Sequence, residues 1–144
     1  MNGFDFDSKF KKGPFDLIGE YAYFNLQKGG VESDAATAVP NLLHGFYVQA
    51  NYHFWWSFLN DTFLGRGFER PTFVLVGAYG NARIADDGDT DFNGLNNENR
   101  WSLGLNYRPV PTWVFKLEYQ WNRSKTEPLE RADNGFIVSA SAAF

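Results

Sequence analysis

Residues 112–124 read TWVFKLEYQWNRS and alternate between two kinds of side chain. The odd-numbered positions from Trp113 to Trp121 are all aromatic or aliphatic, whereas most even-numbered positions are charged or amide. Because successive side chains of a β-strand point to opposite faces of its sheet, the stretch predicts a strand with one face of large apolar rings and one polar face.

The same alternation, less regular, recurs along the rest of the chain. The seven expected strands cover residues 3–11, 15–26, 42–54, 72–84, 99–108, 112–124 and 135–144. Residues 72–84 are ambiguous because both sets of positions are largely apolar. We assign Val74, Val76 and Ala78 to the apolar face there, since Asn81 and Arg83 share the other set of positions.

Composition narrows the class of protein. Aromatic residues make up 19% of the chain, yet the mean hydropathy is −0.40. No stretch approaches the roughly 18–20 apolar residues that a spanning helix needs, which excludes a helical membrane protein. A closed β-barrel is the other structure that satisfies its backbone in lipid. The net charge of −4 argues against a nucleic-acid partner, and the absence of cysteine excludes disulfides and thiol chemistry.

The expected connections alternate in length. Residues 27–41, 85–98 and 125–133 form long polar links, whereas 12–14 and 109–111 form short turns. Long loops at one end and short turns at the other are typical of bacterial outer-membrane barrels. Residues 55–71 break the rule and are expected to hold an irregular or partly helical segment. Aromatic residues expected at the membrane interfaces are Trp101, Tyr107, Trp113, Tyr119 and Trp121.

Seven is an odd number of strands, and bacterial single-chain barrels use even numbers. The first residues also show no export signal. We therefore expect residues 1–144 to be a single barrel segment, the C-terminal part of a longer barrel. The alternative is a complete eight-stranded barrel with one more strand within residues 55–70.

Several stretches resemble a known family. Residues 100–120, RWSLGLNYRPVPTWVFKLEYQ, look like a hairpin near the end of many Gram-negative porins. Residues 45–52, GFYVQANY, and 67–71, GFERP, are similar to a region of phosphate-selective-type porins. Phe144, preceded by alternating apolar residues, resembles the terminal signal read by the barrel assembly machinery. The residues of that signal are Phe136, Val138, Ala140, Ala142 and Phe144.

The resemblance implies a sixteen-stranded, trimeric transmembrane β-barrel in the bacterial outer membrane, in contact with lipid, that passes anions or small solutes. The candidate pore-lining residues are Asp16, Glu20, Arg83, Arg100, Asn106, Arg108, Lys116, Glu118 and Gln120. Their charges are mixed, so the phosphate preference of the family is not carried over. The expected function is a water-filled channel for passive diffusion of small solutes or ions, with size as the main filter and opposed charges as a secondary one.

Other functions have weaker support. No catalytic site, metal site or cofactor is expected, because Ser139 and Ser141 have no partner at motif spacing and the two histidines, His44 and His53, lie on opposite faces of one strand. An acidic calcium-type loop beginning at Asp89 lacks the final glutamate. A small eight-stranded barrel with a structural or adhesive role would need bulky inward residues, and a soluble ligand-binding barrel would purify without detergent.

Overall fold

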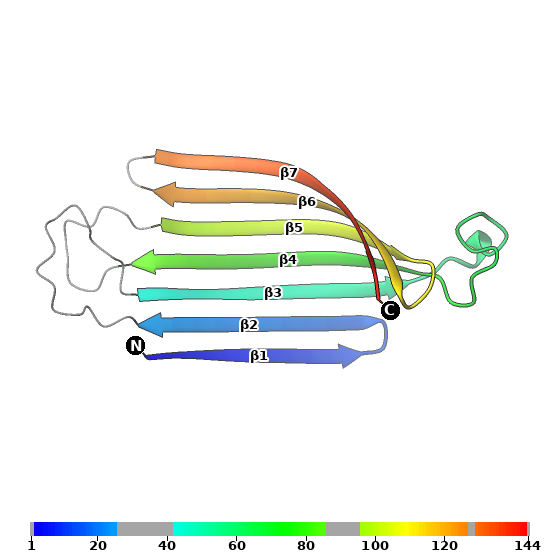
Figure 1. The fold of residues 1–144 in the computed structure, drawn as a ribbon, viewed down its shortest axis with the longest axis horizontal. Coiled ribbons are helices and arrows are strands. Elements are labelled where there is room, and N and C mark those ends of the chain that lie inside the picture. Colours follow the sequence, from blue (N-terminus) through cyan, green and yellow to red (C-terminus); the bar gives the residue numbers. More distant parts are fainter. Residues whose placement is uncertain (1, 26–41, 86–95, 127–128, 144) are drawn as a thin grey trace, which may run out of the picture.

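One antiparallel sheet contains all of the extended structure. The computed structural model describes residues 2–25, 42–85, 96–126 and 129–143. Its strands are β1 (Asn2–Lys12), β2 (Phe15–Asn25), β3 (Leu42–Phe54), β4 (Thr72–Ala85), β5 (Asn96–Arg108), β6 (Trp113–Thr126) and β7 (Leu129–Ala142). Each strand pairs with its neighbours in chain order, and Figure 1 shows them side by side from β1 at one edge to β7 at the other. No helix among these residues has the length and apolar character needed to cross a membrane.

The seven strands predicted from the alternation are all present, but one predicted loop is not. β6 extends to Thr126 and β7 starts at Leu129, and their register pairs Lys125 with Glu130. Most of the long link expected at residues 125–133 is therefore strand, and that prediction was wrong. Backbone pairing holds a strand together whatever its side chains are, so the polar residues there gave no sign that the hairpin continues.

Residues 55–71 contain the short 3-10 helix η1 (Ser57–Leu59) and several turns, as expected for an irregular, partly helical segment. The eighth strand considered for residues 55–70 is absent from this described segment. The segment is held in place by the Tyr107 hydroxyl of β5, which donates a hydrogen bond to the Leu64 carbonyl. It lies beyond the ends of the strands, on the side where the chain ends in Figure 1.

The register defines two faces, because residues that pair directly across strands share a face. The aromatic face carries most of the large rings and many of the aliphatic residues of the strands. Rows that illustrate it are Phe10–Leu17–Ala50–Gly77–Leu103–Tyr119–Phe136 and Phe15–Tyr52–Leu75–Leu105–Leu117–Val138. The polar face carries amides, hydroxyls and charges. A row that illustrates it is Asp7–Glu20–Tyr47–Gly80–Arg100–Asn122–Asp133.

The faces of β4 are the reverse of the sequence prediction. Tyr52 of β3 pairs with Leu75, whereas Asn51 pairs with Val76, so Val74, Val76 and Ala78 lie on the polar face. Asn81 and Arg83 lie on the aromatic face, opposite Phe46 and His44. The prediction failed because it treated the polar end of β4 as evidence about the whole strand. These two residues stand close to the strand's end, where a spanning strand has already left the apolar zone.

Very little of the sheet is buried. The described residues that are buried in the strands include Val74, Val76, Ala78 and Asn51, and all four lie in the middle of the polar face. The large rings of the aromatic face stay exposed, for example Trp101 at 58% and Phe115 at 45%. A water-soluble sheet would cover such a surface with a second layer. Here the rings of the aromatic face are left exposed instead, with no second layer among the described residues.

Candidate functional site

The polar face is the candidate site, and it gathers most of the pore-lining residues expected from the sequence. The register places Asp16, Glu20, Arg100, Asn106, Arg108, Lys116, Glu118 and Gln120 on this one face. Arg83 is the exception, because it lies on the aromatic face. It is therefore withdrawn from the pore-lining set.

Hydrogen bonds between side chains run along the strands of the polar face. On β3 the Tyr47 hydroxyl donates to Gln49, whose amide nitrogen donates to Asn51 Oδ1 at 2.7 Å. On β6 the Gln120 amide donates to Glu118 Oε1 at 2.6 Å. Side chains two positions apart on a strand share a face, so these bonds form ladders parallel to the strands. The ladders fix polar groups in place along the surface of the sheet.

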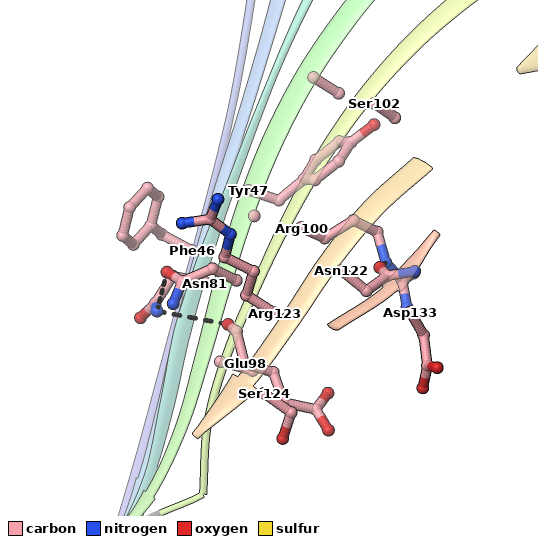
Figure 2. Close-up of a pocket in the computed structure, with 14 residues that line it drawn as sticks. Phe46, Tyr47, Asn81, Glu98, Arg100, Ser102, Asn122, Arg123, Ser124 and Asp133 are labelled. Carbon is pink, nitrogen blue, oxygen red and sulfur yellow. Dashed lines mark hydrogen bonds between the residues drawn. The ribbon is translucent and has the colours of Figure 1, made fainter. Parts of the chain in front are cut away.

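A hollow of about 490 Å³ lies at the end of the sheet where β2, β4 and β6 finish. Most of its lining belongs to the polar face, including Tyr47, Glu98, Arg100, Ser102, Asn122 and Asp133. Arg100 Nε donates to Asn122 Oδ1 at 2.7 Å, across the β5–β6 pair. Figure 2 shows these two residues on one side of the strands and Phe46 and Asn81 on the other. The hollow thus offers cationic, anionic and neutral hydrogen-bonding groups together.

A second polar cluster lies near the short turns. The Asp16 carboxylate of β2 is 2.9 Å from His53 Nε2 of β3, and its other oxygen is 3.8 Å from Lys11 Nζ of β1. Asp16 is largely covered, with 13% of its side chain exposed, whereas Lys11 is 67% exposed. The sequence identified Asp16 but not its contact with His53, since residues 37 positions apart meet only through the register. No group of three or more potential metal ligands occurs among the described residues.

Charge is distributed unevenly over the polar face. On β1 and β2 the acids Asp5, Asp7, Asp16 and Glu20 outnumber Lys9 and Lys11. On this face β3 and β4 contribute mostly neutral side chains, such as Tyr47, Gln49, Asn51 and Ala78, with His53 near the end of β3. On β5 and β6 the bases Arg100, Arg108 and Lys116 outnumber Glu98 and Glu118. An acidic flank on β1 and β2 is therefore separated by two nearly uncharged strands from a flank on β5 and β6 where bases exceed acids by one. Asp133 of β7 lies on the same face beside that second flank.

The aromatic face has two rows of contacting rings, one near each end of the strands. Near the short turns, contacts run from Phe54 through Phe73 and Tyr107 to Phe115, with centroids 5.1–6.3 Å apart. Near the other end, Phe46 contacts Tyr79, and Tyr79 contacts Trp101 at 4.2 Å. Trp101 pairs with Trp121. Aliphatic residues such as Leu103 and Leu117 lie between the rows.

The residues named as an assembly signal share the aromatic face. Phe136, Val138, Ala140 and Ala142 pair with Tyr119, Leu117, Phe115 and Trp113. Phe144 itself lies outside the described residues, and so does the acidic loop that begins at Asp89. The sequence did not single out Tyr47, Asn122 or Asp133. The alternation placed Tyr47 and Asn122 on the polar face, whereas Asp133 fell in an expected loop. Only the register shows that all three border one hollow.

A meandering antiparallel sheet with one ring-lined apolar face, two aromatic rows and one polar face is the wall of a transmembrane β-barrel of the porin class. Comparison with protein families agrees. The model of the family described as phosphate-selective porin O and P matches residues 7–144. The chain belongs to this family of bacterial outer-membrane channels. Searches of curated proteins and of solved structures gave no significant match.

Proposed function

We propose that this chain forms part of the wall of a water-filled channel through which small solutes and ions diffuse passively. The observation that carries the proposal is a polar face with hydrogen-bonded side chains along its strands, on the opposite side of the sheet from a face of exposed rings. Rings in contact with acyl chains lower the free energy of the sheet in a membrane. The polar groups on the other side keep water in the lumen.

The selectivity that we propose is weak and not directed to phosphate. An anion-selective pore needs a clear excess of cationic groups along its lumen. Here acidic residues outnumber basic ones on β1 and β2, and both kinds border the hollow. Opposed charges on the two flanks act on the dipole of a passing solute, while the width of the lumen sets the size limit.

We propose that further strands close the barrel. Within the described residues, β1 and β7 each have a single neighbouring strand, so their outer backbone groups have no partner in the sheet. Each backbone group left without a hydrogen-bond partner in hydrocarbon raises the free energy by roughly several kcal/mol. An open sheet edge is therefore unstable in a membrane. A longer barrel, of sixteen strands and assembled as a homotrimer as the family resemblance implies, satisfies them. Insertion by the barrel assembly machinery belongs to the same proposal.

A charge reversal on the polar face tests the channel. We expect Lys116→Glu in the full-length porin to shift the reversal potential toward cations, measured in planar bilayers under a salt gradient. Lys116 is exposed on the polar face, between Asn106 and Ser139 in the register, so its charge acts on ions in the lumen.

Lys12→Glu is the matched control, because Lys12 pairs with Phe15 on the other face. It should move the reversal potential much less. Equal shifts of the reversal potential in the two variants, or no shift in either, would contradict the assignment of Lys116 to the lumen. A protein that inserts but conducts no current would favour the small structural barrel over the channel.

A further inference from the structure

Tyr47 places an aromatic ring on the polar face of the sheet. Of the Phe, Tyr and Trp residues in the described strands, only Tyr47 and Phe24 lie on this face, and only Tyr47 borders the hollow. Tyr47 is 38% exposed, and its hydroxyl donates to Gln49 along the strand, which holds the ring in place. Because apolar ring surface in contact with water raises the free energy, the exposed ring suits a solute with an apolar face of its own.

The floor of the hollow beside this ring consists of small residues. Ala78, Gly80 and Ala82 of β4 follow one another on the polar face, and Ser102 of β5 pairs with Ala78. A Cβ atom at Gly80 would lie 3.5 Å from Tyr47 Cδ2, so the edge of the ring already reaches Gly80 from β3. The small side chains leave an open strip of β4 between Tyr47 and the longer side chains of β5.

The side of the strip opposite Tyr47 carries hydrogen-bonding groups. One register row runs Tyr47–Gly80–Arg100–Asn122, so the ring and the guanidinium belong to strands two spacings apart, roughly 10 Å. Arg100 Nε donates to Asn122 Oδ1 at 2.7 Å, which uses one of the five N–H donors of the guanidinium. Glu98 adds a carboxylate acceptor at the same border. Figure 2 shows the Tyr47 ring and the Arg100–Asn122 pair on the same side of the strands.

The charged residues that border the hollow balance one another. Glu98 and Asp133 are anionic, whereas Arg100 and Arg123 are cationic. A solute with a net charge therefore gains little from the hollow as a whole. A hydroxyl group donates to a carboxylate and accepts from a guanidinium, so a neutral solute with many hydroxyls can use both kinds of group. The volume of about 490 Å³ lies within the range of small-molecule sites, roughly 300–1,000 Å³.

We propose that the hollow is a weak binding subsite for a neutral pyranose sugar on its passage through the channel. One face of a pyranose ring presents C–H groups, which pack against the Tyr47 ring. The hydroxyls at the edge of the sugar exchange hydrogen bonds with Arg100, Asn122 and Glu98. A small zwitterion such as glycine would also match the balanced charges, but it has no flat apolar face for Tyr47. The inference rests on the proposed function, because it requires the polar face to line a lumen.

Block of the ion current by added sugar tests the proposal, with the full-length porin in planar bilayers. We expect maltotriose to reduce the current in a saturable way. Tyr47→Ala should raise the half-saturating concentration about tenfold, because an aromatic contact and its buried area are lost. Tyr47→Phe keeps the ring and should retain most of the affinity. Gly80→Val keeps every hydrogen-bonding group but fills the floor of the hollow with a residue that strands favour, and it should weaken the block by a similar factor.

Phe24→Ala is the matched control, because Phe24 is an exposed ring on the same face but outside the hollow, and it should leave the half-saturating concentration unchanged. A channel that conducts ions but is not blocked by maltotriose overturns this inference and leaves the proposed function standing. A chain that forms no channel overturns both. The inference is also overturned if Tyr47→Ala is blocked normally, or if Phe24→Ala loses the block equally. Block by sorbitol, glycine or phosphate that is as tight, with the same dependence on Tyr47, would overturn the assignment to a sugar ring.

Discussion

Leu103 and Ser102 are neighbours in the chain, yet their surroundings differ completely. Leu103 is 52% exposed between the two aromatic rows, whereas Ser102 lies on the polar face at the edge of the hollow. They differ because successive side chains of a β-strand point to opposite faces of the sheet. This period made the faces of most strands readable from the sequence.

The two positions give a direct test of which face meets lipid. We expect Leu103→Arg to destabilise the folded barrel by about 2–4 kcal/mol, because that is the cost of a cation on the lipid side near the bilayer midplane. Ser102→Arg places the same side chain one residue away, where water can solvate it, and should cost far less. Unfolding in a urea titration from lipid vesicles measures both. Similar losses for the two variants would contradict the assignment of the faces.

Arg83 shows where reasoning from single residues stops. Its charge suggested a wet surface, and on an ambiguous strand that suggestion decided the face. The register of β3 and β4 places it on the aromatic face instead, because Phe54 pairs with Phe73 and Val48 with Tyr79. A charged residue near a strand end carries little information about the face, since both faces are solvated there.

At the scale of elements, residues 55–71 differ most from an ordinary turn. Hydrogen bonds within the segment include Arg66 N to the Thr62 carbonyl at 2.8 Å and Trp55 Nε1 to Asn60 Oδ1 at 2.8 Å. Its rings continue the aromatic row near the short turns, since Trp56 contacts both Phe54 and Phe58. The sequence predicted an irregular piece here but not its attachment to β5, because the Tyr107–Leu64 bond spans 43 positions.

The backbone of this segment packs closely around Gly65. A Cβ atom there would meet the Leu59 carbonyl oxygen and lie 2.8 Å from Asn60 Cα, and both are backbone atoms that cannot move cheaply. We expect Gly65→Ala to destabilise the segment by about 1–3 kcal/mol. The measurement is limited proteolysis of the full-length porin in detergent, which should cut within residues 55–71 sooner than in the unmodified protein.

Gly77→Ala is the control for that experiment, because a Cβ atom at Gly77 meets nothing within 4 Å. Its cleavage pattern should match that of the unmodified protein. An unchanged pattern for Gly65→Ala as well would mean that the packing of the segment tolerates a methyl group, contrary to the geometry.

At the scale of the whole molecule, the alternation of side chains predicted the number of strands and the faces of all of them except β4. Local periodicity says which residues form strands, and short links make sequential strands neighbours. The hollow and the Asp16–His53 contact arise from pairing between distant residues, so they were beyond the reach of the sequence alone. The extent of the β6–β7 hairpin was missed for the same reason.

Assembly is a property of the whole barrel, and the last strand contributes to it. Replacing Phe144 with Ser removes an aromatic ring that follows β7 in the chain, and the apolar positions Phe136 to Ala142 of that strand share the aromatic face. We expect outer-membrane levels of the full-length porin to fall at least several-fold, with the protein accumulating unfolded in the periplasm. Quantitative immunoblotting of membrane fractions measures this. Ser139→Ala, on the opposite face, is the control, and normal levels of both variants would contradict a terminal assembly signal.

The nearly uncharged strip formed by β3 and β4 affects how solutes pass through the pore. From β2 to β5 is three strand spacings, roughly 14 Å, so the acids of β1 and β2 face the bases of β5 and β6 across a strip of that width. A zwitterion moving along this strip would turn its two ends toward the matching flanks and travel broadside. Its orientation, rather than its net charge, would then determine how quickly it crosses.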